Sequence, residues 1–101
     1  MSKSSEELVR ASIIVGLRAI GDEVPQIVLY YLQTEHGIVL EDIANDPVRL
    51  GKGLKAVFGD LGARLVIESI LRDAGNHPSH PSRYHHFMEG LKTYKTSLFS
   101  A

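Results

Sequence analysis

Four histidines and one glutamate form the main concentration of reactive side chains in this sequence. His77, His80, His85 and His86 lie in one Pro- and Ser-containing stretch, and Glu89 follows His85 by four residues. Imidazole and carboxylate groups are ligands of divalent metals such as zinc. On a helix, His85 and Glu89 share one side, whereas the adjacent His85 and His86 point about 100° apart. The first hypothesis is therefore a divalent metal site made of His85, Glu89, His77 and His80.

The same histidines also fit a solvated linker and helix start, where they would bind metal only adventitiously. No second cluster of metal-ligating residues elsewhere in the sequence completes a metal centre. A third interpretation is a pH response, because four histidines with the usual pKa of about 6.5 would add positive charge on mild acidification. We expect no resident cofactor, and we keep the divalent metal as the alternative.

The composition predicts one folded domain and excludes several classes of chemistry. The chain has 101 residues, of which 44% are apolar and 23% charged, as in globular proteins. It has no cysteine, which excludes disulfides, thiolate catalysis and Cys-ligated metal centres. Phosphate-loop, zinc-protease and serine-hydrolase motifs are absent from the sequence. Paired acids such as Glu6 and Glu7 lie near expected helix starts, where they stabilise the helix dipole. We therefore expect that the protein is not an enzyme.

The distribution of charge and hydropathy predicts the environment of the chain. Residues 1–75 carry more Asp and Glu than Lys and Arg, whereas residues 76–101 carry three basic residues and one acid. An acidic body offers no broad surface for phosphates, so nucleic-acid binding is disfavoured. The first residues lack the order of a secretory signal, and no apolar run approaches the ~20 residues that span a bilayer. We expect a cytoplasmic protein that does not bind membranes.

The spacing of apolar residues predicts an all-α fold. Expected helices cover residues 4–21, 22–37, 46–59, 60–75 and 82–98. Asp22 and Asp46 are expected helix caps, and Gly37 and Gly59 are expected helix ends. We predict a compact bundle of about four core helices in a domain of residues 1–75. Residues 76–101 then form a His- and Pro-containing linker and an amphipathic C-terminal helix, packed on the core or on a partner chain.

The second expected helix carries two consecutive tyrosines. Its predicted core face contains Val24, Ile27, Val28 and Tyr31. Because Tyr30 and Tyr31 are neighbours, we expect one of them in the core and the other at a rim or interface.

Packing and turn residues between positions 6 and 73 carry a resemblance to a known family. They are Leu29-Tyr30-Tyr31-Leu32, Asp42-Ile43, Pro47, Ala56-Val57-Phe58-Gly59, Gly62-Ala63 and Ile67-Glu68-Ser69-Ile70-Leu71. In these residues the chain resembles the archaeal Nitrosopumilus-type output domain, a compact all-helical module found alone or behind sensory and regulatory domains. The resemblance implies a signalling-output or protein-interaction role and supplies no catalytic residues. The histidine stretch and the last helix lie outside the matching part.

Together these observations predict a non-catalytic regulatory or protein-interaction module that forms a homodimer and serves a partner in a signalling or regulatory system. The first helix, apolar on nearly all sides, and the last helix are the candidate interfaces, unless both are satisfied inside one chain. The alternative is a metal-binding protein that uses the C-terminal histidines. The second alternative is a small DNA-binding regulator, although the helix after Gly59 presents only Arg64 and Arg72 among acids.

Overall fold

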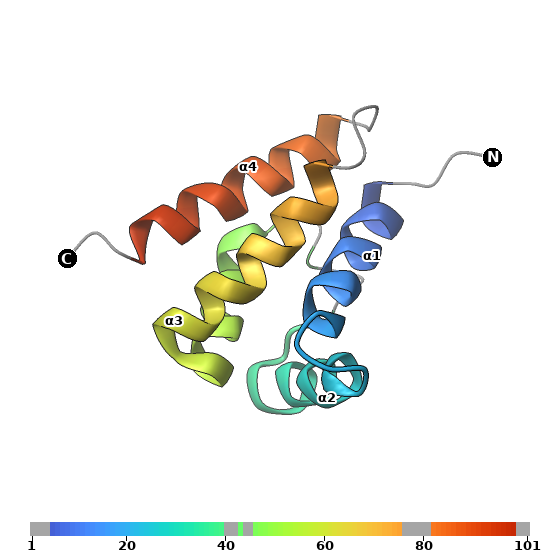
Figure 1. Cartoon of the computed structure of the whole chain (residues 1–101), viewed down its shortest axis with the longest axis vertical. Coiled ribbons are helices and arrows are strands. Elements are labelled where there is room, and N and C mark those ends of the chain that lie inside the picture. Colours follow the sequence, from blue (N-terminus) through green and yellow to red (C-terminus); the bar gives the residue numbers. More distant parts are fainter. Residues whose placement is uncertain (1–4, 40–42, 44–45, 76–81, 99–101) are drawn as a thin grey trace.

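Four helices follow one another along the chain. The computed structural model describes residues 5–39, 43, 46–75 and 82–98. The helices are α1 (Ser5–Arg18), α2 (Val24–His36), α3 (Pro47–Gly75) and α4 (Ser82–Ser97), and the described residues form no strand. The second half of α3 lies between α1 and α4, and α2 covers one end of this layer (Figure 1). The predicted all-α class is confirmed. Within the described ranges, none of the helices is long and apolar enough to cross a membrane.

Helix α3 combines the third and fourth helices expected from the sequence. Its backbone leaves helical geometry at Gly59, where φ is 76° and ψ is 178°. A residue with a side chain would be strained at this positive φ, whereas glycine adopts it readily. The predicted boundary at Gly59 is therefore confirmed as a sharp kink between residues 47–58 and 60–75.

Two of the three expected helix ends and caps considered next agree with the structure. Gly37 adopts a left-handed conformation with φ of 61° and donates its backbone N–H to the carbonyl of Leu32, as expected for a helix C-cap. The carboxylate of Asp46 accepts a hydrogen bond from the backbone N–H of Arg49 at 3.0 Å, which caps α3. The expected Asp22 cap is wrong, because α2 begins after Glu23 without a side-chain cap.

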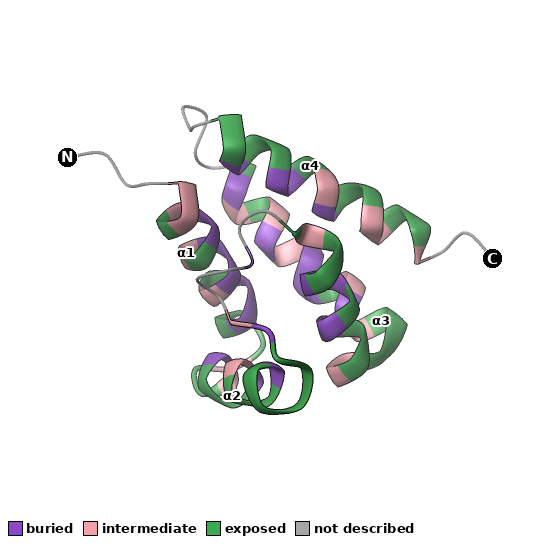
Figure 2. Cartoon of the chain, turned by 180° about the vertical axis from the view of Figure 1, so that it is seen from behind, coloured by how far each residue is buried: buried purple, intermediate pink, exposed green. Residues whose placement is uncertain are grey.

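Buried side chains from all four helices, together with Ile38 and Ile43, form one hydrophobic core. Figure 2 shows the buried residues on the sides of the helices that face one another. Helix α4 contributes Tyr84, Phe87 and Leu91, each no more than 2% exposed. It contacts α3 and α1 of its own chain, so its aromatic stripe is packed inside the protomer.

Helix α1 contacts each of the other three helices. Its buried face comprises Val9, Ser12, Ile13, Gly16 and Leu17. The closest approach is to α3, because a Cβ at Gly16 would meet the Ile70 side chain and would lie 3.1 Å from the Ile70 backbone nitrogen. The first helix, which is apolar on nearly all sides in the sequence, therefore has neighbours on several sides within its own chain.

The predicted core face of α2 is only partly correct. Val28 and Leu32 are buried, but Ile27 is 64% exposed. Tyr30 and Tyr31 are 70% and 41% exposed, so the expectation that one of them lies in the core is wrong. The physical reason is the position of α2 at one end of the bundle, where only one side of the helix meets the other helices (Figure 2).

The close approach of α1 and α3 predicts an asymmetric response to alanine. Gly16→Ala should lower the free energy of unfolding by about 1–2 kcal/mol, because its Cβ has no room against Ile70. Gly75→Ala is the matched control, since nothing lies within 4 Å of its Cβ position. Urea unfolding monitored by circular dichroism measures the free energy of unfolding of both variants. Equal stability of the two variants would contradict the close approach.

Candidate functional site

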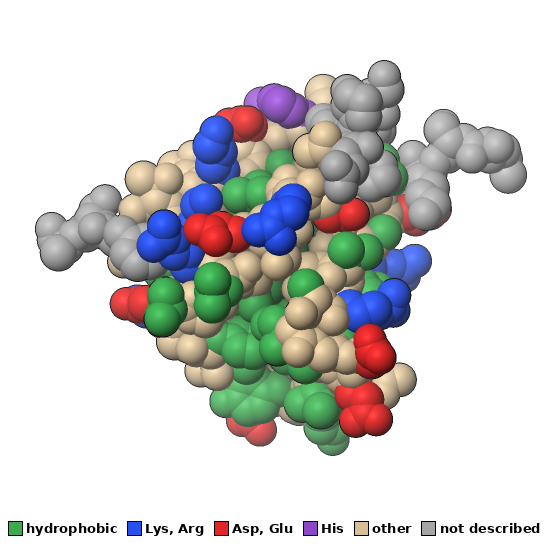
Figure 3. Space-filling model, in the orientation of Figure 1, with side chains coloured by type: hydrophobic (Ala, Val, Ile, Leu, Met, Phe, Trp, Pro, Cys, Tyr) green, Lys and Arg blue, Asp and Glu red, His purple; other side chains and the backbone are tan. Residues whose placement is uncertain are grey.

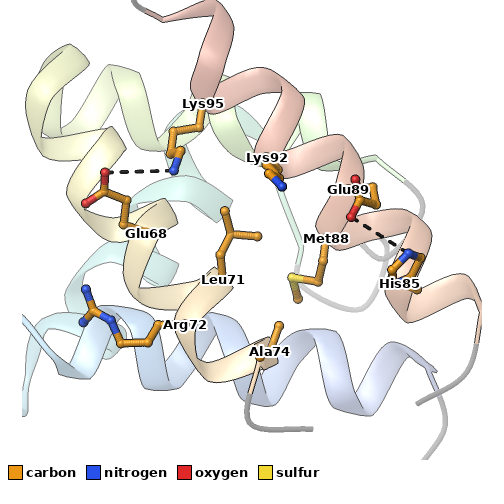
Figure 4. Close-up of a pocket in the computed structure, with 10 residues that line it drawn as sticks. Glu68, Leu71, Arg72, Ala74, His85, Met88, Glu89, Lys92 and Lys95 are labelled. Atoms are coloured by element: carbon orange, nitrogen blue, oxygen red, sulfur yellow. Dashed lines mark ion pairs between the residues drawn. The ribbon is translucent and has the colours of Figure 1, made fainter. Parts of the chain in front are cut away.

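A groove between α3 and α4 brings together five charged side chains and His85. Its volume is about 550 Å³. Helix α3 forms one wall and α4 forms the other (Figure 4). The lining residues are Glu68, Leu71, Arg72, Ala74, Gly75, His85, Met88, Glu89, Lys92 and Lys95.

The metal-ligand pair expected from the sequence lies at one end of this groove. His85 Nε2 and Glu89 Oε1 are 3.9 Å apart, and both side chains are more than half exposed. His86 on the same helix is also exposed. His77 and His80 lie outside the described residues, so the complete ligand set stays a prediction. Among the described residues, no three His, Cys, Asp or Glu side chains are grouped closely enough to hold a metal ion.

Two basic side chains pair with Glu68, one of the acidic residues of the groove. Glu68 Oε1 accepts a hydrogen bond from Arg64 Nε at 3.0 Å and lies 3.9 Å from Lys95 Nζ on the opposite helix. The second contact crosses the groove from α3 to α4 (Figure 4). Because these groups are partly exposed, their main effect is to set the local charge rather than to stabilise the fold.

A buried polar cluster joins three helices beneath the first turn of α4. Ser12 on α1 is 1% exposed, and its hydroxyl donates to Asp73 Oδ2 on α3 at 2.8 Å. The same hydroxyl lies 2.7 Å from the hydroxyl of Tyr84 on α4, which is fully buried. A serine hydroxyl has one proton, and here it goes to the carboxylate. Tyr84 therefore donates to Ser12, and Ser12 donates to Asp73.

Burial raises the pKa of the Tyr84 hydroxyl above its ordinary value of 10.0. The hydrogen bond with Ser12 acts in the opposite direction, and the negative charge of Asp73 adds to the increase. Tyr84 thus stays protonated and remains a donor across the neutral range. The two hydroxyl groups are buried and Asp73 is partly exposed, so the cluster offers no nucleophile at a surface and we interpret it as structural.

A third feature is the outer face of α2, which we define as Gln26, Ile27, Tyr30, Tyr31 and Thr34, all exposed. No charged residue occurs between Val24 and Thr34. The Tyr31 and His36 rings lie 5.5 Å apart near the end of the helix. Figure 3 shows hydrophobic side chains gathered over the end of the molecule that holds α2 and the α3 kink, whereas charged side chains cover α3 and α4.

The sequence pattern alone did not group the residues of the buried cluster or of the groove. In the sequence, Ser12 is an isolated polar residue in an apolar helix, and Tyr84 is one member of an aromatic stripe. The one available signal was a hydroxyl residue within the apolar run of the first helix, since a buried hydroxyl must find a hydrogen-bond partner. Nothing in the sequence names Asp73 as that partner, because 61 residues separate them.

Comparisons of the chain with models of protein families, with characterised proteins and with solved structures found no match. The resemblance to the output-domain family accordingly stays a prediction. The functional argument rests on the residues and surfaces of this chain.

Removal of the Tyr84 hydroxyl should destabilise the protein. Tyr84→Phe deletes a buried donor and leaves Ser12 with one unsatisfied lone pair, which lowers the free energy of unfolding by about 1–2 kcal/mol. Tyr30→Phe removes the same atom from an exposed position and should change stability little. Denaturant unfolding of both variants is the measurement. A Tyr84→Phe variant as stable as Tyr30→Phe would show that the cluster contributes nothing.

The raised pKa of Tyr84 predicts a dependence of stability on alkaline pH. Because the folded pKa is above the unfolded value, this contribution is complete below about pH 10 and is lost as pH rises through the folded pKa. The wild-type protein should therefore lose stability more steeply above pH 10 than Tyr84→Phe. Thermal unfolding from pH 8 to 11 measures the difference, and parallel curves would contradict it.

The metal hypothesis predicts stoichiometric retention of zinc by protein purified without a histidine tag. Loss of that zinc in His85→Ala and in Glu89→Ala, but not in the neighbouring control His86→Ala, would support a specific site. Native mass spectrometry reports the retained metal directly. Weak zinc binding that is unchanged by His85→Ala and by Glu89→Ala would contradict a specific site.

Proposed function

We propose that the protein is a non-catalytic helical interaction module that self-associates through the outer face of α2. The observation that carries this proposal is an exposed helix face with an isoleucine, two tyrosines and no charge. Isolated exposed apolar residues are ordinary in soluble proteins. Here Ile27, Tyr30 and Tyr31 follow i, i+3, i+4 spacing and therefore form one continuous stripe.

The composition of this face is typical of the centre of a protein interface. Interface centres are depleted in charge and enriched in tyrosine, whose ring buries apolar area while its hydroxyl finds a partner. The nearest carboxylates are Glu23, directly before α2, and Glu35, in its last turn. A partner that covered the outer face would therefore desolvate no charge at its centre.

The geometry favours a second copy of the chain as the partner. The stripe spans positions 27–31 and is centred on position 29, near the middle of the 13-residue helix, so a two-fold axis there superimposes the stripe on its own copy. Antiparallel pairing then places Ile27 against Tyr31 of the second copy and opposes the two helix dipoles favourably. In this register Glu23 and Glu35 of the two copies meet only at the exposed edges of the contact, and its centre holds no charge.

The two interfaces first expected from the sequence are occupied within the protomer. Helix α1 lies against three helices, and α4 buries its aromatic stripe against α3 and α1. This internal packing weakens the proposal of a dimer through α4. It leaves α2 as the helix with the most exposed aromatic surface, since Tyr30 is 70% exposed.

Self-association predicts a monomer after charge is placed on the α2 face. Ile27→Glu and Tyr30→Glu should each weaken the dimer by at least about tenfold, since each would bury a carboxylate at the two-fold contact. Leu65→Glu on α3 is the matched control, because Leu65 is 55% exposed outside the proposed interface. Analytical ultracentrifugation measures the dissociation constants.

Two outcomes would overturn this proposal. One is a wild-type chain that sediments as a monomer at high micromolar concentration. The other is a dimer that persists in Ile27→Glu and Tyr30→Glu but dissociates in Leu65→Glu, which would move the interface to α3.

A further inference from the structure

A hollow of about 430 Å³ lies between α1 and α2. Five of the side chains that line it are apolar, namely Ile14, Leu29, Leu32, Ile38 and Val39. Among the described residues, no carboxylate lines the hollow, and its polar side chains are Arg10 and Gln33. Small-molecule pockets in proteins have volumes of about 300–1,000 Å³ and are mostly apolar with a few polar groups. The hollow therefore has the size and the composition of a binding pocket for a small molecule.

The floor of the hollow is fixed by the core beneath it. Leu32 and Ile38 are 1% and 5% exposed and belong to the hydrophobic core. A Cβ at Gly53 on α3 would lie 2.8 Å from Ile38 Cδ1 and 2.8 Å from Leu32 Cδ2. These two methyl groups thus already lie against the α3 backbone, and the floor cannot recede from the hollow.

The wall that follows α2 is held by two hydrogen bonds. The backbone N–H of Ile38 donates to the carbonyl of Leu32 at 3.0 Å. The Arg49 guanidinium on α3 donates to the carbonyl of Gly37 at 2.9 Å. Because the backbone is anchored at both Gly37 and Ile38, the hollow is preformed and a ligand does not have to order it.

We propose that this hollow binds a compact, uncharged and largely apolar molecule. Ile14, Leu29 and Val39 are each only partly buried, so a ligand in the hollow would remove their exposed apolar surface from water. Water in the hollow finds few hydrogen-bond partners among its side chains, which favours its displacement by an apolar group. Arg10 and Gln33 are exposed, so one polar atom of the ligand is tolerated at the solvent edge.

The lining of the hollow decides against charged ligands. A cation would find no carboxylate among the described lining residues and would meet Arg10. An anion would have one basic side chain beside five apolar ones, and burial of its charge against them is unfavourable. An uncharged ligand avoids both costs.

The hollow is separate from the outer face of α2. Successive helical residues are rotated by about 100°, so Leu29 lies about 160° around the helix from Ile27. A second copy of the chain on the outer face would therefore leave the hollow open, and the binding proposal goes beyond the proposed self-association.

Isoleucine methyl groups report directly on the hollow, because Ile14 and Ile38 line it whereas Ile27 lies on the outer face of α2. Protein labelled with ¹³C at the isoleucine Cδ1 methyl groups is titrated with naphthalenemethanol, an uncharged ring compound with one hydroxyl. We expect saturable shifts of the Ile14 and Ile38 signals and no shift of the Ile27 signal, with each signal assigned through an Ile→Val variant. Naphthoate and naphthylmethylammonium carry the same rings with a negative or a positive charge. Each should bind at least about fivefold more weakly.

Substitutions on adjacent residues of α1 test the position of the ligand. Ile14→Trp should weaken naphthalenemethanol binding at least about tenfold, measured at Ile38, because the indole ring fills volume that the ligand needs. Val15→Trp is the matched control, since Val15 is 44% exposed and does not line the hollow, and it should leave the affinity unchanged. Leu29→Asn keeps the size of the side chain but makes the wall polar, and it should weaken binding about threefold or more.

The proposal fails if naphthalenemethanol leaves Ile14 and Ile38 unmoved, or if it shifts Ile27 with equal affinity, which would place binding on the outer face of α2. It also fails if either charged analogue binds as tightly as the alcohol, or if Ile14→Trp binds it as tightly as Val15→Trp does. Circular dichroism confirms that each variant is folded before its affinity is compared. Should Ile14→Trp not fold, Leu29→Asn decides by the same comparison.

Discussion

The hydrogen bonds at Ser12 are the constraint on which the arrangement of three helices depends. A buried hydroxyl without partners costs free energy, and Ser12 finds both of its partners on other helices. Asp73 lies near the end of α3 and Tyr84 in the first turn of α4, so one small group fixes the place where the two helices meet α1. The ion pair between Glu6 and Arg83, at 3.1 Å, joins α1 to the same turn of α4 at the surface.

Close contacts along α4 extend this arrangement to the other half of α3. A Cβ at Gly51 would meet the ring of Tyr94, and a Cβ at Gly90 would meet Pro47. Because α3 is kinked at Gly59, both of its halves lie against α4. The groove is a consequence of this packing. Its floor is the edge of the core, and its walls are the polar sides of two helices whose relative position is already determined.

The two proposed sites differ in their physical character. The outer face of α2 is aromatic and uncharged, which suits a contact that excludes water between two protein surfaces. The hollow between α1 and α2 is concave and apolar, which suits a small molecule. Figure 3 shows charged side chains over α3 and α4 and hydrophobic ones toward α2. A helical module with this distribution can associate with a second copy and still leave the hollow open.

The sequence by itself determined the features that depend on neighbouring residues. The helix end at Gly37, the Asp46 cap, the break at Gly59 and the apolar spacing of the second half of α3 are local, so their signals lie within a few residues. Tertiary structure alone decided which side of α2 is buried, because its apolar stripe is wider than the contact that an end position provides. It also decided that Ser12 meets Asp73 and Tyr84 and that Glu68 on α3 meets Lys95 on α4. These contacts join residues that no sequence period relates, and only the packing of whole helices brings them together.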